Sequence, residues 1–202
     1  MTLLSGQTIR KRFILFVILN LFTLSACVKN PEKTALSLAS EQGDLPKIQH
    51  LVQQGVDISA KDGRGLDALS YAIANEHPEV VAYLLNHGAS ANTEDDRGIT
   101  ALIISATVGN NEIVKNLHEH GAQVNRATHD GITPLMAAAG SDNHDTVILL
   151  LSYGADPCSK DKNQLTARQT AEQWRGVLET SRAISRNKKL EQLNCDKGGA
   201  NE

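Results

Sequence analysis

The chain has 202 residues, of which 41% are hydrophobic and 21% are charged, a balance typical of folded rather than disordered proteins. Aromatic residues make up only 3%, and all three Phe residues lie in the first 26 positions. A core built from Ala, Leu, Val and Ile argues against a β-sandwich or barrel and favours close-packed helices. The formal net charge of -3 has the wrong sign for a protein that binds nucleic acid through bulk basicity.

The first 26 residues have the pattern of a signal peptide. Three basic residues, 10–12, precede an apolar run over 13–24. That run is too short for a transmembrane helix, which needs about 20 apolar residues, but it suits a secretory signal. We therefore expect residues 1–26 to be a cleaved targeting segment.

Leu24-Ser25-Ala26-Cys27 resembles the lipobox of bacterial lipoproteins. The resemblance implies cleavage before Cys27 and attachment of acyl chains such as palmitate to that residue. Because Val28 rather than Asp follows, it also implies an outer-membrane lipoprotein that faces the periplasm. The alternative is an ordinary signal peptide with a coincidental cysteine. Residues 27–33 would be the lipidated cysteine and its short tether, whose residues 28–33 reach about 20 Å when fully extended.

A 33-residue period fills the rest of the chain. It is visible in a column of glycines (Gly55, Gly88, Gly121, Gly154), in columns of leucines (Leu36, Leu69, Leu102, Leu135 and Leu51, Leu84, Leu117, Leu150) and in a column of small residues (Ala39, Ala72, Ser105, Ala138, Ala171). The spacing within each unit predicts helix, turn, helix and extended turn. One unit cannot bury its own apolar face, so we predict that the units stack into an all-α solenoid.

Helix ends are marked in the same register. The column that precedes each first helix consists of residues that cap helix N-termini well (Thr34, Asp67, Thr100, Thr133, Thr166). The glycine column closes each second helix, because glycine adopts the left-handed conformation at little cost. Short hairpin turns such as Asp62-Gly63-Arg64-Gly65 are expected between units.

Two stretches, Asp95–Leu102 and Gly131–Ala139, resemble the ankyrin repeat. The resemblance covers about residues 34–187 and implies an ankyrin-repeat domain over residues 34–194. Its units are expected at 34–61, 62–94, 95–127 and 128–160, with a divergent cap at 161–194 and a polar tail at 195–202. In the cap, Gln164 stands in place of Gly and Arg168 in place of Leu.

Cys158 and Cys195 flank the last unit, and an oxidising periplasm would favour a disulfide between them. The alternative is two separate thiols, because sequence cannot show the Cα separation that a bridge needs. The seven His residues have no zinc-binding spacing, and no catalytic motif is present. We therefore expect no metal, no cofactor, no small-molecule substrate and no enzymatic activity.

In ankyrin proteins, the concave face made by the turn tips and first helices binds another protein. The resemblance places a partner site at these positions: Arg64, Leu66, Arg97, Ile99, Asp130, Ile132, Asn163 and Leu165. Trp174, on the first helix of the last unit, is a further candidate because Trp and Arg are the commonest interface hot spots. The alternative is that the apolar members pack one hairpin on the next and that Trp174 covers the cap.

The expected function is a non-enzymatic protein-binding module, lipid-anchored in a bacterial envelope. The chain resembles immunity lipoproteins that neutralise periplasm-acting antibacterial effectors, such as type VI secretion phospholipases. The partner would then be the effector, inhibited by occlusion of its active site. The alternative is a periplasmic ankyrin scaffold that supports an envelope enzyme or a stress response.

Overall fold

The computed structural model describes residues 33–175, together with the side chains of residues 33–171. The chain divides into two units, Met1–Pro31 and Glu32–Glu202, and every described helix belongs to the second. The predicted signal peptide, Cys27 and Cys195 therefore lie outside the described residues.

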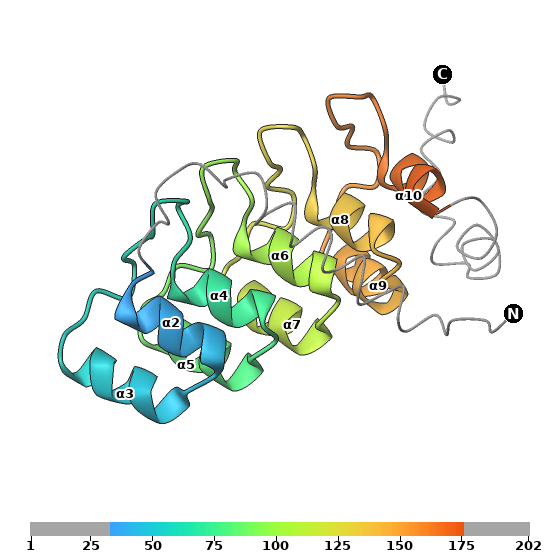
Figure 1. Ribbon diagram of the computed structural model, residues 1–202. Helices are drawn as coiled ribbons and strands as arrows, with labels where there is room; N and C mark the ends of the chain where they lie inside the picture. The colour runs from blue at the N-terminus through green and yellow to red at the C-terminus, as the bar shows by residue number, and fades with distance from the viewer. Residues whose placement is uncertain (1–32, 176–202) are drawn as a thin grey trace, which may run out of the picture. The chain divides into compact units, whose positions relative to one another are not determined.

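The described residues form successive pairs of short helices joined by extended hairpin turns (Figure 1). The helices are α2 (Ala35–Gln42) and α3 (Leu45–Gln53), α4 (Ala68–Ala74) and α5 (Pro78–Asn86), α6 (Ala101–Val108) and α7 (Asn111–Glu119), α8 (Pro134–Gly140) and α9 (His144–Ser152), and α10 (Ala167–Arg175). Within these residues the only β pairing is an isolated bridge between Glu94 and Thr100. The all-α repeat solenoid is confirmed.

The first helix of each pair begins at the predicted cap. The Oγ1 atoms of Thr34 and Thr100 accept the amide N–H three residues later at 3.0 and 3.2 Å, and the carboxylate of Asp67 does so at 2.9 Å. Each bond satisfies an amide that the helix leaves free. The turn to the second helix uses left-handed residues, including Gly43 (φ 70°) and Asp142 (φ 62°). None of the described helices has the length and apolar character needed to cross a membrane.

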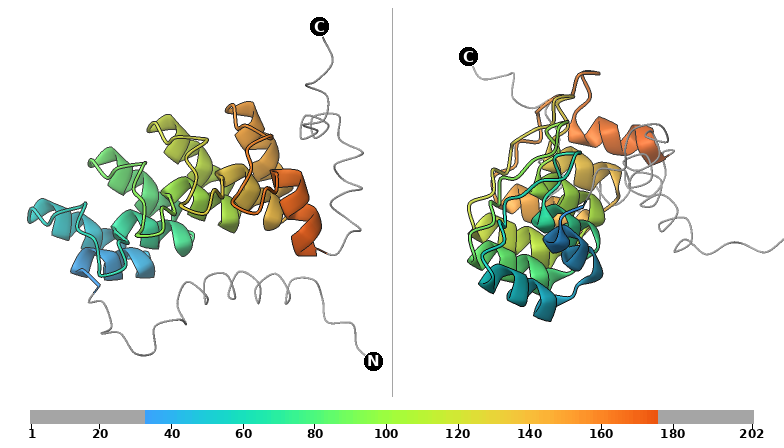
Figure 2. Two further views of the ribbon diagram at one scale, coloured as in Figure 1. Left: turned by 90° about the horizontal axis from the view of Figure 1, so that it is seen from above. Right: turned by 60° about the vertical axis from the view of Figure 1, so that its left-hand side comes forward.

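The core lies between neighbouring pairs. In Figure 2 the first helices α2, α4, α6, α8 and α10 follow one another side by side, and the second helices form a row behind them. The predicted column of small residues lies on the first helices and is fully buried, with exposed fractions of 0–1%. Small side chains allow close approach of the helices, and the leucine columns fill the space beside them.

Asparagine side chains tie successive loops together behind the hairpin turns. The Asn92 Nδ2 group donates to the Gly121 carbonyl at 3.0 Å, and its Oδ1 atom accepts the Gln123 amide at 2.8 Å. Asn125, 33 residues later, makes the same two bonds to the next loop, at 3.1 and 2.8 Å. Loops that lack a sheet between them are thereby held in register.

The last unit departs from the pattern in two ways. Gln164 replaces the glycine of the earlier hairpin turns but adopts the same left-handed backbone, with φ 63° against 75° at Gly98. Cys158, which is exposed in the turn after α9, is disulfide-bonded. It is the only cysteine among the described residues, so its partner lies outside them, and the pairing with Cys195 stays a prediction.

Replacing Asn92 by Ala should lower the free energy of unfolding by about 1 kcal/mol, because two hydrogen bonds between loops are lost. Urea denaturation followed by far-UV circular dichroism measures this. The matched control is Gln123→Ala, which removes an exposed neighbouring side chain but keeps the backbone amide that Asn92 binds. Equal stability of the two variants would contradict a structural role for the asparagine bridge.

Candidate partner-binding site

Each predicted hairpin turn is organised by one side chain. In the first, the Asp62 Oδ1 atom accepts the backbone N–H groups of Arg64 and Leu66 at 2.8 and 3.0 Å. In the second, Asp95 does the same for Arg97 and Ile99 at 2.9 and 2.8 Å. An aspartate that binds the amide two residues later is an Asx turn.

The later turns repeat this arrangement. Thr128 uses its Oγ1 atom to accept the amides of Asp130 and Ile132 at 3.3 and 3.1 Å. The Asp161 carboxylate accepts the amides of Asn163 and Leu165 at 2.8 and 2.9 Å. The predicted partner residues of four units therefore occupy equivalent places in four similar turns.

Backbone hydrogen bonds join some of these turns directly. The His129 amide donates to the Arg97 carbonyl at 3.0 Å, and the Lys162 amide donates to the Asp130 carbonyl at 2.9 Å. The Lys162 ammonium also lies 2.8 Å from the Asp130 carboxylate, but both side chains are well exposed, so this ion pair adds little stability. The turns stand in a row, which we call the hairpin row: residues 62–66, 95–99, 128–132 and 161–165.

The four apolar side chains of the hairpin row are only half-buried. Leu66, Ile99, Ile132 and Leu165 all have intermediate exposure. Ile132 packs in part against the core. Half-burial is compatible both with hairpin packing and with an apolar strip offered to a partner, so the partner role of these residues stays a prediction.

The two arginines of the hairpin row differ in their contacts and in the exposed fraction of their side chains. Arg64 donates through Nη2 to the carboxylate of Asp62 and to the hydroxyl of Tyr71, and 27% of its side chain is exposed. Arg97 pairs only with Asp95 among the contacts described, at 3.1 and 3.2 Å, and 53% of its side chain is exposed. Arg97 is therefore the better placed of the two to contact a partner.

Asp62 and Tyr71 form a buried polar pair beneath the first turn. The Tyr71 hydroxyl donates to Asp62 Oδ2 at 2.7 Å. Burial disfavours the carboxylate, but the hydrogen bonds from Tyr71 and from two turn amides outweigh it, so the pKa of Asp62 lies below its usual range. Burial, aided by the same hydrogen bond, raises the pKa of Tyr71. The carboxylate stays ionised and the phenol neutral at pH 7.

The sequence did not reveal this pair. Tyr71 is 2% exposed, and its place in a column of core residues indicates only a structural role. In the structure it also holds Arg64, and Lys33 lies 4.8 Å from the centre of its ring. The available signal was the recurrence of aspartate at positions 62, 95 and 161, four residues before an apolar member of the hairpin row.

Trp174 lies in α10, but its side chain is outside the described residues. Its predicted contact with a partner is therefore not placed by the structure. Asn163 is exposed at the last turn, where its side chain donates to Asp161 at 3.2 Å.

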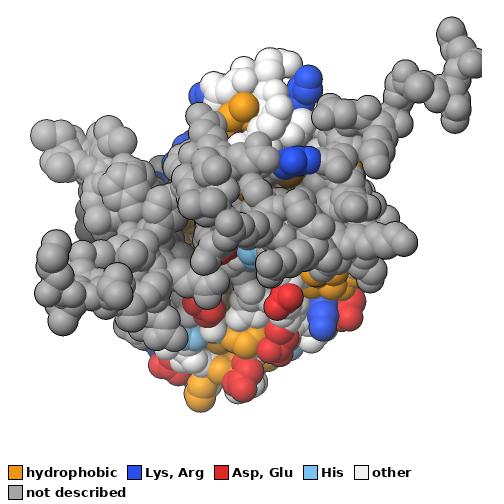
Figure 3. Space-filling view, turned by 90° about the vertical axis from the view of Figure 1, so that its right-hand side faces the viewer, with side chains coloured by type: hydrophobic (Ala, Val, Ile, Leu, Met, Phe, Trp, Pro, Cys, Tyr) orange, Lys and Arg blue, Asp and Glu red, His pale blue; other side chains and the backbone are white. Residues whose placement is uncertain are grey.

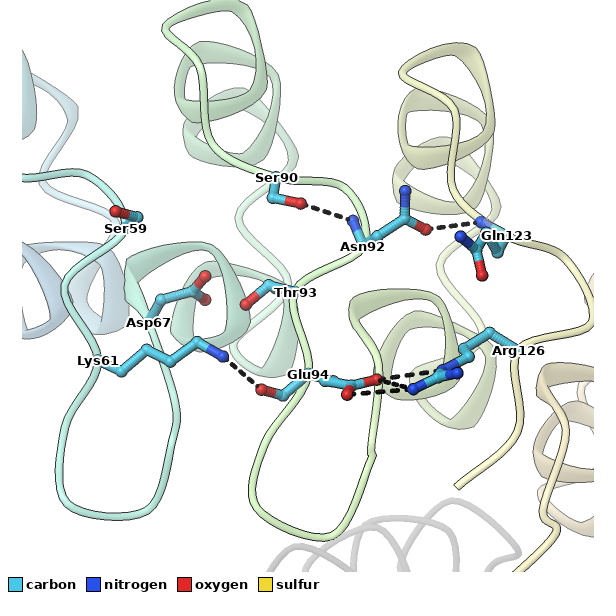
Figure 4. Close-up of a pocket in the computed structure, with 9 residues that line it drawn as sticks. All are labelled: Ser59, Lys61, Asp67, Ser90, Asn92, Thr93, Glu94, Gln123 and Arg126. Atoms are coloured by element: carbon cyan, nitrogen blue, oxygen red, sulfur yellow. Dashed lines mark hydrogen bonds and ion pairs between the residues drawn. The ribbon is translucent and has the colours of Figure 1, made fainter. Parts of the chain in front are cut away.

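An open depression of about 490 Å³ lies apart from the predicted residues, between the stems of neighbouring hairpins (Figure 4). Most of its polar groups bind one another. Lys61 donates to the Glu94 carbonyl at 2.7 Å, and the Arg126 guanidinium pairs with the Glu94 carboxylate at 3.1 Å. Among the described buried side-chain polar atoms that line this depression, the Thr93 hydroxyl alone has no hydrogen-bond partner. These contacts therefore link successive loops and have a structural role.

Histidines in the described region serve structural contacts. The ring of His118 stacks on Tyr153 with centroids 3.7 Å apart, and that of His87 stacks on Tyr83 at 3.9 Å. His77 is half-buried and binds the Glu41 carbonyl at 3.1 Å. Residues 33–171 contain no group of three His, Cys, Asp or Glu side chains that could hold a metal ion.

The helix pairs, hairpin turns and asparagine bridges define a helical repeat protein. The family model for ankyrin repeats (3 copies) matches residues 14–95 and 88–161, and the chain belongs to the ankyrin-repeat family. Ankyrin repeats mediate protein–protein interactions, so the domain is a protein-binding module. No curated protein matches the chain.

Replacing Asp62 by Asn should destabilise the protein at pH 7, and the difference from wild type should shrink as pH falls. A carboxyl whose pKa is lowered by folding stabilises the fold above its unfolded pKa, near 4, and loses that contribution as pH falls through the folded pKa. Unfolding free energies measured between about pH 7 and pH 3 give this difference.

Asp96→Asn is the matched control, because Asp96 lies in the next turn and is exposed. Its difference from wild type should stay small at every pH. If the difference in unfolding free energy between Asp62→Asn and wild type did not change with pH, the buried hydrogen bond between Tyr71 and the Asp62 carboxylate would be contradicted as a source of stability.

Proposed function

We propose that this chain is a lipid-anchored ankyrin module of a bacterial envelope that binds a toxic, periplasm-acting effector and blocks its active site. The anchor is supported by the basic residues 10–12, the apolar run 13–24 and the lipobox-like sequence that ends at Cys27. The absence of Asp after that cysteine supports transport to the outer membrane, with the domain in the periplasm.

We propose the hairpin row as the binding surface. It brings half-buried apolar side chains and the half-exposed Arg97 to successive positions along the stack. Arginine is one of the residues that most often dominate interface energies. An interface of standard size, about 1,600 Å² in total, is enough to cover the mouth of an enzyme active site.

The cysteines are consistent with this location. Cys158 is disulfide-bonded, as expected in an oxidising compartment. A thioether to lipid would use the sulfur of Cys27, and Cys195 would then be the only cysteine left to pair with Cys158. Lipid attachment and the disulfide thus account for all three cysteines of the chain.

The anchor can be tested by labelling cells with palmitate and separating their membranes. The wild-type chain should carry label and remain with the membranes. The Cys27→Ser variant should carry none, whereas Cys195→Ser, the control, should still be labelled. Label on Cys27→Ser would refute the anchor.

The binding face can be tested with the product of a neighbouring toxin or lipase-like gene. Wild type should bind that protein and abolish its activity. Arg97→Glu should weaken binding by roughly ten-fold, the effect of losing about 1.4 kcal/mol. The control Lys115→Glu, an exposed charge on α7, should bind like wild type.

Undiminished toxin activity at saturating ankyrin protein would remove the inhibitor function. Binding without inhibition would favour the scaffold alternative instead. Equal loss of binding in both charge variants would argue against the hairpin row.

A further inference from the structure

The end of the stack formed by α2 and α3 has no preceding repeat among the described residues. At the position of Tyr71, Ile104 and Ala137 in later repeats are half-buried, whereas in the second repeat Ala68, Tyr71 and Leu84 are all buried, at 1%, 2% and 0% exposed. Their equivalents 33 residues earlier, Ala35, Leu38 and Leu51, are exposed or half-buried. We call these three residues the N-terminal end face.

Leu38 shows the difference most clearly. Its exposed fraction is 41%, and it is the one exposed large hydrophobic side chain among the described residues. Single exposed leucines are common, but this one shares its end of the stack with two other apolar positions that the repeat pattern would bury. Figures 1 and 2 show α2 and α3 at the end of the row of helix pairs.

We propose that the N-terminal end face lies against the lipid surface of the membrane, so that the stack stands away from the bilayer and the hairpin row faces sideways. This inference rests on the proposed lipid anchor at Cys27. Only residues 28–33 separate that anchor from the described domain, a length of at most about 20 Å. The end face begins two residues later, at Ala35, so a tether of this length keeps it within reach of the bilayer.

Charge favours the same orientation. Between residues 33 and 53 the two basic side chains, Lys33 and Lys47, balance the two acidic ones, Glu41 and Asp44. Residues 54–202 hold 14 basic and 20 acidic side chains. An anionic lipid surface repels the acidic part and leaves the neutral, apolar end free to approach.

The outer helices oppose the alternative of a stack lying on its side. Glu79, Glu112 and Asp145 recur in the first turns of α5, α7 and α9. On the face shown in Figure 3, Asp and Glu side chains are exposed over the lower part, among hydrophobic ones. These helices would meet an anionic surface unfavourably, and the end face would not.

Fluorescence quenching by brominated lipid tests the proposal on the full, lipidated chain. Leu38→Trp places an indole on the end face, and Ser152→Trp places the control on α9, where Ser152 is exposed. Both variants carry Trp174→Phe, so that each has one tryptophan. They are reconstituted in vesicles of phosphatidylethanolamine and phosphatidylglycerol, with or without bromine on the acyl chains.

Brominated lipid should reduce the fluorescence of Leu38→Trp and leave that of Ser152→Trp unchanged, whereas aqueous iodide should quench only the control. Quenching of Leu38→Trp by iodide and not by lipid would overturn the proposal. Protection from both quenchers would mean that protein, such as a second copy of the chain, covers the end face, and would overturn it too.

The intact mass of the same samples separates this inference from the proposed function. An acylated Cys27 with no lipid quenching at Leu38→Trp refutes the orientation alone. A chain without acyl groups refutes the anchor, and the orientation falls with it.

Discussion

Close packing of successive first helices holds the stack of repeats together. Each helix has only 7–9 residues and buries little within its own pair. The Ala and Ser side chains between α2, α4, α6, α8 and α10 are 0–1% exposed, and they let each pair share a core with its neighbours. A larger side chain in this column would separate the pairs and move every later hairpin turn out of line.

The hairpin row depends on that spacing and adds its own support. Asp62 and Asp95 fold their turns from within, because each carboxylate binds two amides of the turn. Beneath the first turn, Tyr71 links the turn to α4 through Asp62 and Arg64. The turns are thus ordered in the free chain, and a preorganised surface of this kind would lose less conformational entropy on binding.

Periodicity explains how much the sequence could predict. The helix pairs, their threonine and aspartate caps, the glycine turns and the buried small column all repeat every 33 residues, so each position is supported by several copies. Even the exception is regular, since Gln164 adopts the backbone of the glycine that it replaces.

What occurs once in the chain could not be predicted in this way. The Tyr71 position is Leu38, Ile104 and Ala137 in other units. The recurring aspartates could therefore indicate the turn, but not the bonds that Tyr71 makes to Asp62 and Arg64. The difference in exposure between Arg64 and Arg97 has the same origin, because only Arg64 has a tyrosine beside it. The exposure of Leu38 depends on its place in the first repeat, which the 33-residue pattern alone does not distinguish from the same place in later repeats.

Hydrogen exchange of the chain, free and bound to an effector, tests directly whether the hairpin row binds the partner, because it follows every backbone amide. We expect slower exchange on binding in residues 62–66, 95–99, 128–132 and 161–165 together. Protection confined to the outer helices α3, α5, α7 and α9, with the four turns unchanged, would contradict it.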